Sequence, residues 1–419
     1  MWIIYALVLL IIIPSTGCSF SSTNRETDQA KGHISLQDLP SGVRWQISEQ
    51  GLDNQSNVQA DATNTKEDAK KYETENKGPA RPIASGKAVP MYYATTRQRS
   101  GQPGGPNSFY GTERIKKPNP VELGIVVVNI PPQHETGRSE RPFSIFTVEF
   151  KEVAAKHVML IGLNPGMKPD DYFASMRNDL QDHNQEAFVY IHGYWNSFAD
   201  AARKTAQIAH DLKTEMVPIM FSWASQNTFY GYMDDGEAAR DAVDYLYDFL
   251  WDLNTQTNVK KVHFIAHSMG NEVLIQALKA LSTRSLPNGR IYPFHELVLA
   301  APDVDEGIFF SAVKAAQKIC VRITAYVASN DVAMIASHWL RSTSYRVGDS
   351  SPEPFVVAGV QTVDVSNANS DWLGHGYITS NRSVLQDLYS ILEGKEVRKR
   401  FGILESKTST GKIYWKFSP

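Results

Sequence analysis

The chain has 419 residues, of which 42% are hydrophobic and 21% are charged, and its formal net charge is −3. This composition is typical of a globular protein with a large core, and the near-neutral charge gives no electrostatic support for binding to nucleic acid or to anionic surfaces. Two cysteines, Cys18 and Cys320, do not indicate a disulfide framework. Because the sequence contains neither a CxxC pair nor an HExxH motif, it predicts no metal and no other cofactor.

The first residues have the pattern of an export leader. An apolar run covers Trp2–Ile13, and Pro-Ser-Thr-Gly then precedes Cys18. The run is too short to span a bilayer comfortably and has the length of a signal-peptide core. Small residues directly before a cysteine resemble the lipobox of bacterial lipoproteins, although no Lys or Arg precedes the core and Ser15 stands where that box usually has Leu. We expect export to the cell envelope with a lipid anchor on Cys18; an ordinary cleaved leader and an uncleaved anchor are the alternatives.

Residues 19–87 are polar, poor in aromatic residues and rich in Ser, Thr, Asn, Gln, Asp and Lys. Such a segment buries too little apolar surface to order itself, which predicts a flexible tether. Within it, the patch Val43–Ile47 is a candidate for a weak strand. We therefore expect a leader over residues 1–18, a tether over 19–87 and one folded domain over 88–419.

The folded domain is predicted to begin with strands that form the antiparallel edge of a mixed sheet. Aromatic and β-branched runs predict these strands at Val89–Arg97, Leu123–Ile130, Phe143–Phe150 and Val158–Gly162. The segment Gln98–Pro120 is rich in Gly and Pro and predicts a loop. Pro169–Asp182 predicts a helix.

From Glu186 onward strands and helices alternate, which indicates a parallel sheet with helices on both faces. Strands are predicted at Ala187–Ile191, Val217–Trp223, Val262–Ala266, Leu297–Ala301, Ile319–Ala328 and, as the last strand, within Val356–Val365. Helices are predicted at Asp200–Lys213, from a cap at Asp235 to Leu253, at Val273–Leu281, Phe309–Lys318 and Asn381–Leu392. The predicted fold class is therefore α/β, with a mostly parallel, doubly wound sheet and an antiparallel N-terminal edge.

The sequence Ala266-His-Ser268-Met-Gly270 stands where a buried strand pattern changes to helical spacing. This change predicts a strand, a sharp turn and a helix, with the hydroxyl of Ser268 raised at the carboxyl end of the strand. The small residues Ala266 and Gly270 let the strand and the helix approach closely. Ser268 is therefore a candidate nucleophile, and a helix cap is its plain structural alternative.

A serine hydroxyl becomes a good nucleophile when a base removes its proton and an acid orients that base. His375, between two glycines in the loop after the last predicted strand, is the candidate base. Asp331, which follows the second strand after Ser268, is the candidate acid. Asp303, which follows the first of these strands, is the alternative acid, and capping of a helix that starts near Asp305 is its structural alternative.

Two backbone N–H groups are candidates to stabilise a developing oxyanion. One belongs to Met269, directly after the candidate nucleophile, and the other to Tyr194, in the loop after the strand that ends at Ile191. Gly193 is expected to allow a tight bend there. Aromatic residues near the strand ends are candidates to line an acyl pocket, with packing in the core as their alternative role: Tyr194, Trp195, Trp223, Phe229 and Tyr230.

Seven stretches together resemble a bacterial group of α/β-hydrolase-fold proteins in the esterase/lipase superfamily. They are MYYATTR, VYIHGYWNSFADA, PIMFSWAS, HFIAHSMGN, APDVD, YVASNDVAM and GHGY, in this order between Met91 and Tyr377. The resemblance implies the α/β-hydrolase fold and a triad of Ser268, Asp331 and His375, and it leaves the substrate open. Because APDVD belongs to the pattern, Asp303 stays the alternative acid.

We therefore expect a serine hydrolase that cleaves carboxylic esters, either small molecules or lipids, through an acyl-enzyme on Ser268 and without a metal or cofactor. A catalytically silent scaffold of the cell envelope is one alternative. An amidase or peptidase with the same triad is another. The sequence predicts no oligomeric state.

Overall fold

The structure is a computed structural model that describes residues 33–35, 46–47, 82–102, 105–141, 144–145, 148–149, 152–228, 231–329, 345–368 and 381–418. All of them belong to one unit of the chain, Gly32–Pro419. The predicted leader with Cys18 lies outside the described residues. Among the helices of the described ranges, none is long and apolar enough to cross a membrane.

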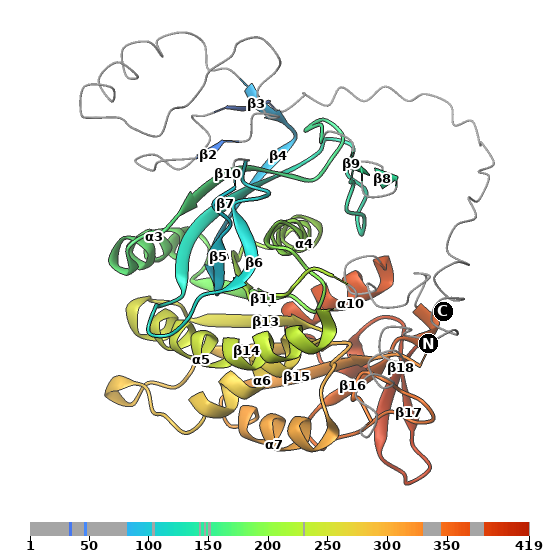
Figure 1. Cartoon of the computed structure of the whole chain (residues 1–419). Helices are drawn as coiled ribbons and strands as arrows, with labels where there is room; N and C mark the ends of the chain where they lie inside the picture. Colours follow the sequence, from blue (N-terminus) through green and yellow to red (C-terminus); the bar gives the residue numbers. More distant parts are fainter. Residues whose placement is uncertain are drawn as a thin grey trace, which may run out of the picture. The chain divides into compact units, whose positions relative to one another are not determined.

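The described strands are organised around one large mixed sheet (Figure 1). In sheet order its strands are β17 (Ile403–Lys407), β18 (Ile413–Phe417), β16 (Gln361–Asp364), β15 (Cys320–Val327), β14 (Phe294–Ala300), β13 (Lys261–His267), β11 (Glu186–Ile191), β12 (Val217–Ser222), β4 (Lys87–Thr95), β7 (Glu122–Ile130), β10 (Met159–Pro165) and β2 (Gln46–Ile47). The strands from β18 to β4 pair in parallel. β7, β10 and β2 continue the sheet in antiparallel pairs, and β17 pairs antiparallel with β18. The predicted mixed, mostly parallel sheet with antiparallel N-terminal strands is therefore confirmed.

Within the described ranges, three small strand pairs lie outside the large sheet. They are β1 (His33–Ser35) with β3 (Pro82–Ser85), β5 (Arg97–Arg99) with β6 (Tyr110–Arg114), and β8 (Ser144–Ile145) with β9 (Val148–Glu149). β6 lies in the segment predicted as a loop, and the strand predicted over Phe143–Phe150 is two short strands instead. β2 lies in the patch Val43–Ile47, which is inside the predicted tether. The boundaries predicted for the leader, the tether and the folded domain stay a prediction.

Helices cover both faces of the large sheet, as Figure 1 shows. One face is packed by α3 (Pro169–Asp182), α5 (Tyr232–Gln256), α6 (Gly270–Leu281) and α7 (Glu306–Ala316). The other face is packed by α4 (Phe198–Asp211) and α10 (Arg382–Leu392). Short 3₁₀ turns occur at Pro287–Gly289, Ser366–Ala368 and Val397–Lys399. Because the central strands are buried on both faces, they are continuous apolar runs in the sequence rather than alternating ones.

The C-terminal strands correct one prediction. The strand predicted as the last one is β16, but β17 and β18 follow α10, and β18 pairs with β16. Apolar side chains of this hairpin (Ile403, Trp415, Phe417) are buried in the cluster that also contains Leu388 of α10. Burial against α10 therefore explains why the chain returns to the sheet after that helix.

The helix cap predicted at Asp235 is wrong, and so is the alternative role of Asp303 as a helix cap. α5 begins at Tyr232 with Gly231 as its N-cap, so Asp235 lies inside the first turns and is fully buried. The N-cap of α7 is Asp305, whose carboxylate accepts from the N–H groups of Gly307 and Ile308, so Asp303 does not cap this helix. Both aspartates have long-range partners instead.

Candidate active site

Ser268 occupies a sharp turn between β13 and α6. Its φ is +52°, in the left-handed region, which costs a residue other than glycine on the order of 1–3 kcal/mol. A Cβ on Gly270 would collide with the backbone oxygen of His192, so only glycine lets α6 approach this closely. The strand, sharp turn and helix predicted around Ser268 are thus confirmed, while its role as nucleophile stays a prediction.

Hydrogen bonds from neighbouring segments hold this turn. The N–H of Ser268 donates to the carbonyl of Ala300 at 3.0 Å, at the end of β14. Asn271 Nδ2 donates to the carbonyls of Ser268 (2.8 Å) and Ala300 (2.9 Å). Because both strand ends are bonded to one side chain, the left-handed turn is fixed relative to β14.

Gly193 follows β11 and lies directly beside the turn. A Cβ on Gly193 would lie 2.6 Å from the Cβ of Ser268 and 2.9 Å from the carbonyl oxygen of His267. Gly193 is not among the residues with a positive φ. The structure therefore corrects the expected reason for this glycine: it is required by close approach to Ser268 rather than by a tight bend.

Asn196 fixes the peptide groups of the loop Gly193–Ser197. Its Nδ2 donates to the carbonyl oxygens of Tyr194 (2.7 Å) and Gly193 (3.3 Å). The Gly193 carbonyl and the Tyr194 N–H belong to one trans peptide, so they point in opposite directions. Holding the carbonyl therefore sets the direction of the N–H predicted to stabilise the oxyanion.

Arg97 holds the same loop from β5. Its guanidinium donates to the carbonyls of Asn196 (2.6 Å) and Ser225 (3.0 Å) and to Ser222 Oγ (3.1 Å). The side chain is 1% exposed, and burial lowers the pKa of Arg97 to about 10, so it is still charged at neutral pH.

His192 packs beneath the loop in its neutral form. Burial, with a smaller effect of the Arg97 charge, lowers the pKa of His192 to about 3. Its ring stacks on Trp223 with centroids 5.0 Å apart, and Nδ1 lies 2.8 Å from the carbonyl of Gly193. Its Nε2 lies 3.1 Å from the carbonyl of Trp223 and 3.3 Å from Ser222 Oγ. His192 therefore supports the loop. Trp223 is fully buried and belongs to the core rather than to an acyl pocket.

Asp235 anchors the loop from α5. Its carboxylate accepts from Ser225 Oγ (2.5 Å), from the N–H of Gln226 (2.6 Å) and from the N–H of Trp195 (3.3 Å). Burial raises the pKa of Asp235. Arg97, Asn196 and Asp235 were all missed as site-supporting residues by the sequence reasoning.

Asp303, the alternative acid, is buried after the end of β14. Its Oδ2 accepts from the hydroxyl of Tyr232 at 2.7 Å, and its Oδ1 forms an ion pair with Arg346 Nε at 3.3 Å. The ring of Tyr232 in turn packs edge-on against Tyr194 with centroids 5.3 Å apart. These contacts connect Asp303 to the loop beside Ser268, and its role as an acid stays a prediction.

The described residues bring together part of the predicted site. Ser268 and the buried Met269 are joined through the Gly193 contact to the loop that carries Tyr194. Trp195 in this loop is 48% exposed. The remaining predicted residues lie outside the described ranges: Asp331, His375, Phe229 and Tyr230.

The sheet, its helices and the serine turn together define an α/β-hydrolase fold. Residues 169–393 match the model of the family described as alpha/beta hydrolase of unknown function (DUF900), which is more than half of the chain. The protein therefore belongs to this family. The matched range includes every predicted catalytic and oxyanion residue.

No curated protein matches the chain. Among solved structures it is similar to a fungal esterase from Rhizomucor miehei, with 10% identity, 78% of this chain and 87% of the esterase chain covered, and a TM-score of 0.29. A likeness at this TM-score carries no argument about function.

Proposed function

We propose that the protein is a serine hydrolase that cleaves carboxylic esters through an acyl-enzyme on Ser268. The observation that carries this proposal is the left-handed Ser268 at the carboxyl end of β13, with Gly193 packed against its Cβ. Non-glycine residues strained in this way cluster at active sites, where the surrounding structure holds them in place. Membership of an α/β-hydrolase family supports the same reading.

In the proposed reaction, Ser268 Oγ attacks the ester carbonyl while His375 takes its proton. Asp331 orients His375, and the N–H groups of Met269 and Tyr194 stabilise the tetrahedral oxyanion. His375 then gives the proton to the leaving alcohol. A water molecule, activated by the same histidine, hydrolyses the acyl-enzyme and restores Ser268.

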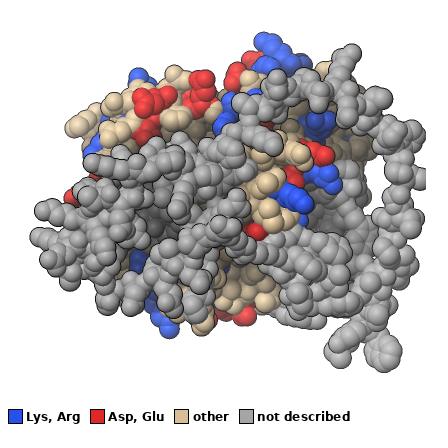
Figure 2. All heavy atoms as spheres, turned by 90° about the horizontal axis from the view of Figure 1, so that it is seen from above, with Lys and Arg blue, Asp and Glu red and all other residues tan. Residues whose placement is uncertain are grey.

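The described surface carries charges of both signs. Figure 2 shows basic and acidic residues interspersed over the described part of one face. The formal net charge of the whole chain is −3. The net charge therefore gives no electrostatic support for a polyanionic substrate.

A fluorophosphonate probe tests the nucleophile, because it reacts covalently with activated serines. We expect labelling of the wild type and no labelling of Ser268→Ala. Ser390→Ala is the matched control, because Ser390 is a buried serine on α10 that donates to the carbonyl of Gln386. Unlabelled wild-type protein that also hydrolyses no aryl ester would favour the silent scaffold. Faster cleavage of amides than of matched esters would favour the amidase or peptidase.

We also propose that a lipid on Cys18 anchors the protein in the cell envelope. The support is the apolar run Trp2–Ile13 and the small residues between it and Cys18. Stable attachment to a membrane takes two or more acyl chains. Mass spectrometry of the mature N-terminus tests this, and an unmodified or absent Cys18 would contradict it.

A further inference from the structure

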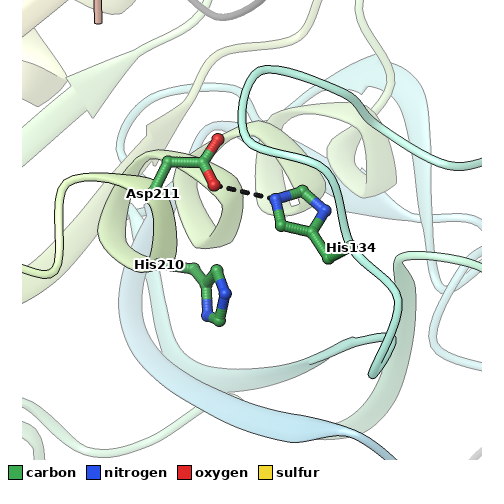
Figure 3. Close-up of side chains that lie close together, drawn as sticks. All are labelled: His134, His210 and Asp211. Carbon is green, nitrogen blue, oxygen red and sulfur yellow. Dashed lines mark hydrogen bonds and ion pairs between the residues drawn. The ribbon is translucent and has the colours of Figure 1, made fainter. Parts of the chain in front are cut away.

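A second group of reactive side chains lies at the C-terminal end of α4. His210 and Asp211 are the last two residues of this helix, and His134 belongs to the loop after β7. One donor atom of each residue lies within 4.8 Å of the other two, and Figure 3 shows the three side chains gathered together. The loop Gly193–Ser197 precedes the opposite end of α4, about 20 Å away along a helix of this length. The group is therefore distinct from the Ser268 site.

The surroundings hold two of the three side chains in fixed orientations. His134 Nε2 lies 2.8 Å from Asp211 Oδ1, and His134 Nδ1 lies 2.8 Å from Glu140 Oε2. The N–H of Gly137 donates to Asp211 Oδ2 at 2.9 Å. The side chains of His134 and Asp211 are 4% and 1% exposed. A histidine that gives one N–H to a carboxylate and turns its other nitrogen inward is the usual arrangement around a bound metal.

His210 is the member whose bonding is incomplete. Its Nδ1 is buried and has no hydrogen-bond partner among the described residues. A buried polar atom without a partner destabilises the folded protein unless a ligand satisfies it. The ring packs edge-on against His134, with centroids 5.2 Å apart and an interplanar angle of 83°.

We propose that His134, His210 and Asp211 bind one zinc ion, with a water molecule as the fourth ligand. Two imidazoles and one carboxylate are a donor set that zinc takes in proteins. Donors around a tetrahedral zinc ion lie about 3.3 Å apart, so small side-chain rotations bring these atoms from their present separations to the required ones. Zinc takes the place of the proton between His134 Nε2 and Asp211 Oδ1, and that proton leaves to solvent. The proton on His134 Nδ1 stays in the hydrogen bond to Glu140. The ion ties the loop after β7 to α4.

Calorimetric titration of the metal-free full chain with zinc tests the proposal. We expect one ion per chain and a rise in Tm of roughly 3–4 °C when free zinc is about a hundredfold above its Kd. Glu140→Gln is expected to weaken zinc binding by about 10–100-fold, because Glu140 orients His134 without contacting the metal. His210→Gln is expected to weaken it by more than that.

The matched control is His183→Gln, a histidine directly after α3 whose Nδ1 lies 2.6 Å from the carbonyl of Asp179. It is expected to bind zinc like the wild type. Cobalt absorption supplies a second readout, since the d–d bands should appear in the wild type and His183→Gln and be lost in His210→Gln. The test does not depend on a variant at Asp211, whose loss would also remove the acceptor of the Gly137 N–H. Absence of zinc binding, or equal binding by His210→Gln and the wild type, would overturn the proposal.

Discussion

The substitution Arg97→Met removes the buried guanidinium that holds the loop beside Ser268. In the wild type this group donates to three carbonyl oxygens, those of Asn196 (2.6 Å), Ser225 (3.0 Å) and Gly111 (3.1 Å). It also donates to Ser222 Oγ at 3.1 Å. Methionine has a similar length and fills the space, but it offers no donor.

The expected cost follows from the acceptors that lose their partner. Each buried acceptor that loses its donor costs about 1–3 kcal/mol. The variant no longer buries a charged guanidinium, and this gain offsets part of the cost. We therefore expect the free energy of unfolding to fall by about 3–5 kcal/mol. Arg99→Met is the matched control two residues further along β5. The side chain of Arg99 is 52% exposed and pairs with Glu122 at 2.9 Å, and a surface pair of this kind contributes less than about 1 kcal/mol.

Urea denaturation followed by tryptophan fluorescence measures both costs, and fluorophosphonate labelling measures the site. In the folded Arg97→Met protein the Tyr194 N–H should lose its fixed direction, so labelling of Ser268 should slow by about 10²-fold, the usual cost of losing one oxyanion donor. Arg99→Met should label at the wild-type rate. Equal costs for the two substitutions, in stability and in labelling, would refute the role assigned to Arg97.

Three further outcomes are expected. Gly193→Ala places a methyl group 2.6 Å from the Cβ of Ser268, so labelling should fall by about 10²-fold or more while circular dichroism shows a folded protein. Asp331→Asn should lower kcat by about 10⁴ and Asp303→Asn by much less, and the reverse order would make Asp303 the acid. The pKa of His192 is about 3 in the folded protein and ~6.5 in the unfolded chain. Between these pH values the unfolded state binds more protons. The free energy of unfolding should therefore fall below pH ~6.5 by up to about 1.4 kcal/mol per pH unit. Urea denaturation at several pH values should give His192→Gln a shallower slope, and an unchanged slope would contradict the buried neutral ring.

The turn around Ser268 could be predicted because its pattern is local. Within Lys261–Leu281 a buried strand and an amphipathic helix have different periods, and the change of period marks the turn. The residues that hold the turn carry no such pattern. Arg97 lies at the end of a predicted strand, and its acceptor Asn196 is 99 residues away in the sequence.

Asp235 shows how a local rule gives a wrong position. An acidic residue at the start of a helical pattern is typical of a cap. Here tertiary contacts prevail, because the carboxylate accepts from Ser225 and Gln226 in the loop after β12. The helix begins three residues earlier, at Tyr232.

The proposed zinc site was missed for a related reason. Short spacing motifs detect metal ligands that lie on one turn or one helix. His134 and His210 belong to segments that meet only because the loop after β7 folds against α4. The neighbouring pair His210-Asp211 gives no useful spacing by itself, and Glu140 acts through His134 rather than as a ligand.

The register of the central sheet explains why the two halves of the candidate site meet. β11 and β13 are parallel neighbours, with Ile191 opposite Ala266, so the loops that follow them leave the sheet side by side. Ser268 then reaches Gly193 directly, and any side chain at Gly193 would separate them. The distance between the serine and the predicted oxyanion donor is therefore set by strand pairing and by one glycine, while Arg97, Asn196 and Asp235 set only the orientation of the donor. Substitutions of these three residues should consequently change the rate of labelling without moving Ser268 itself, whereas a larger residue at Gly193 should displace both.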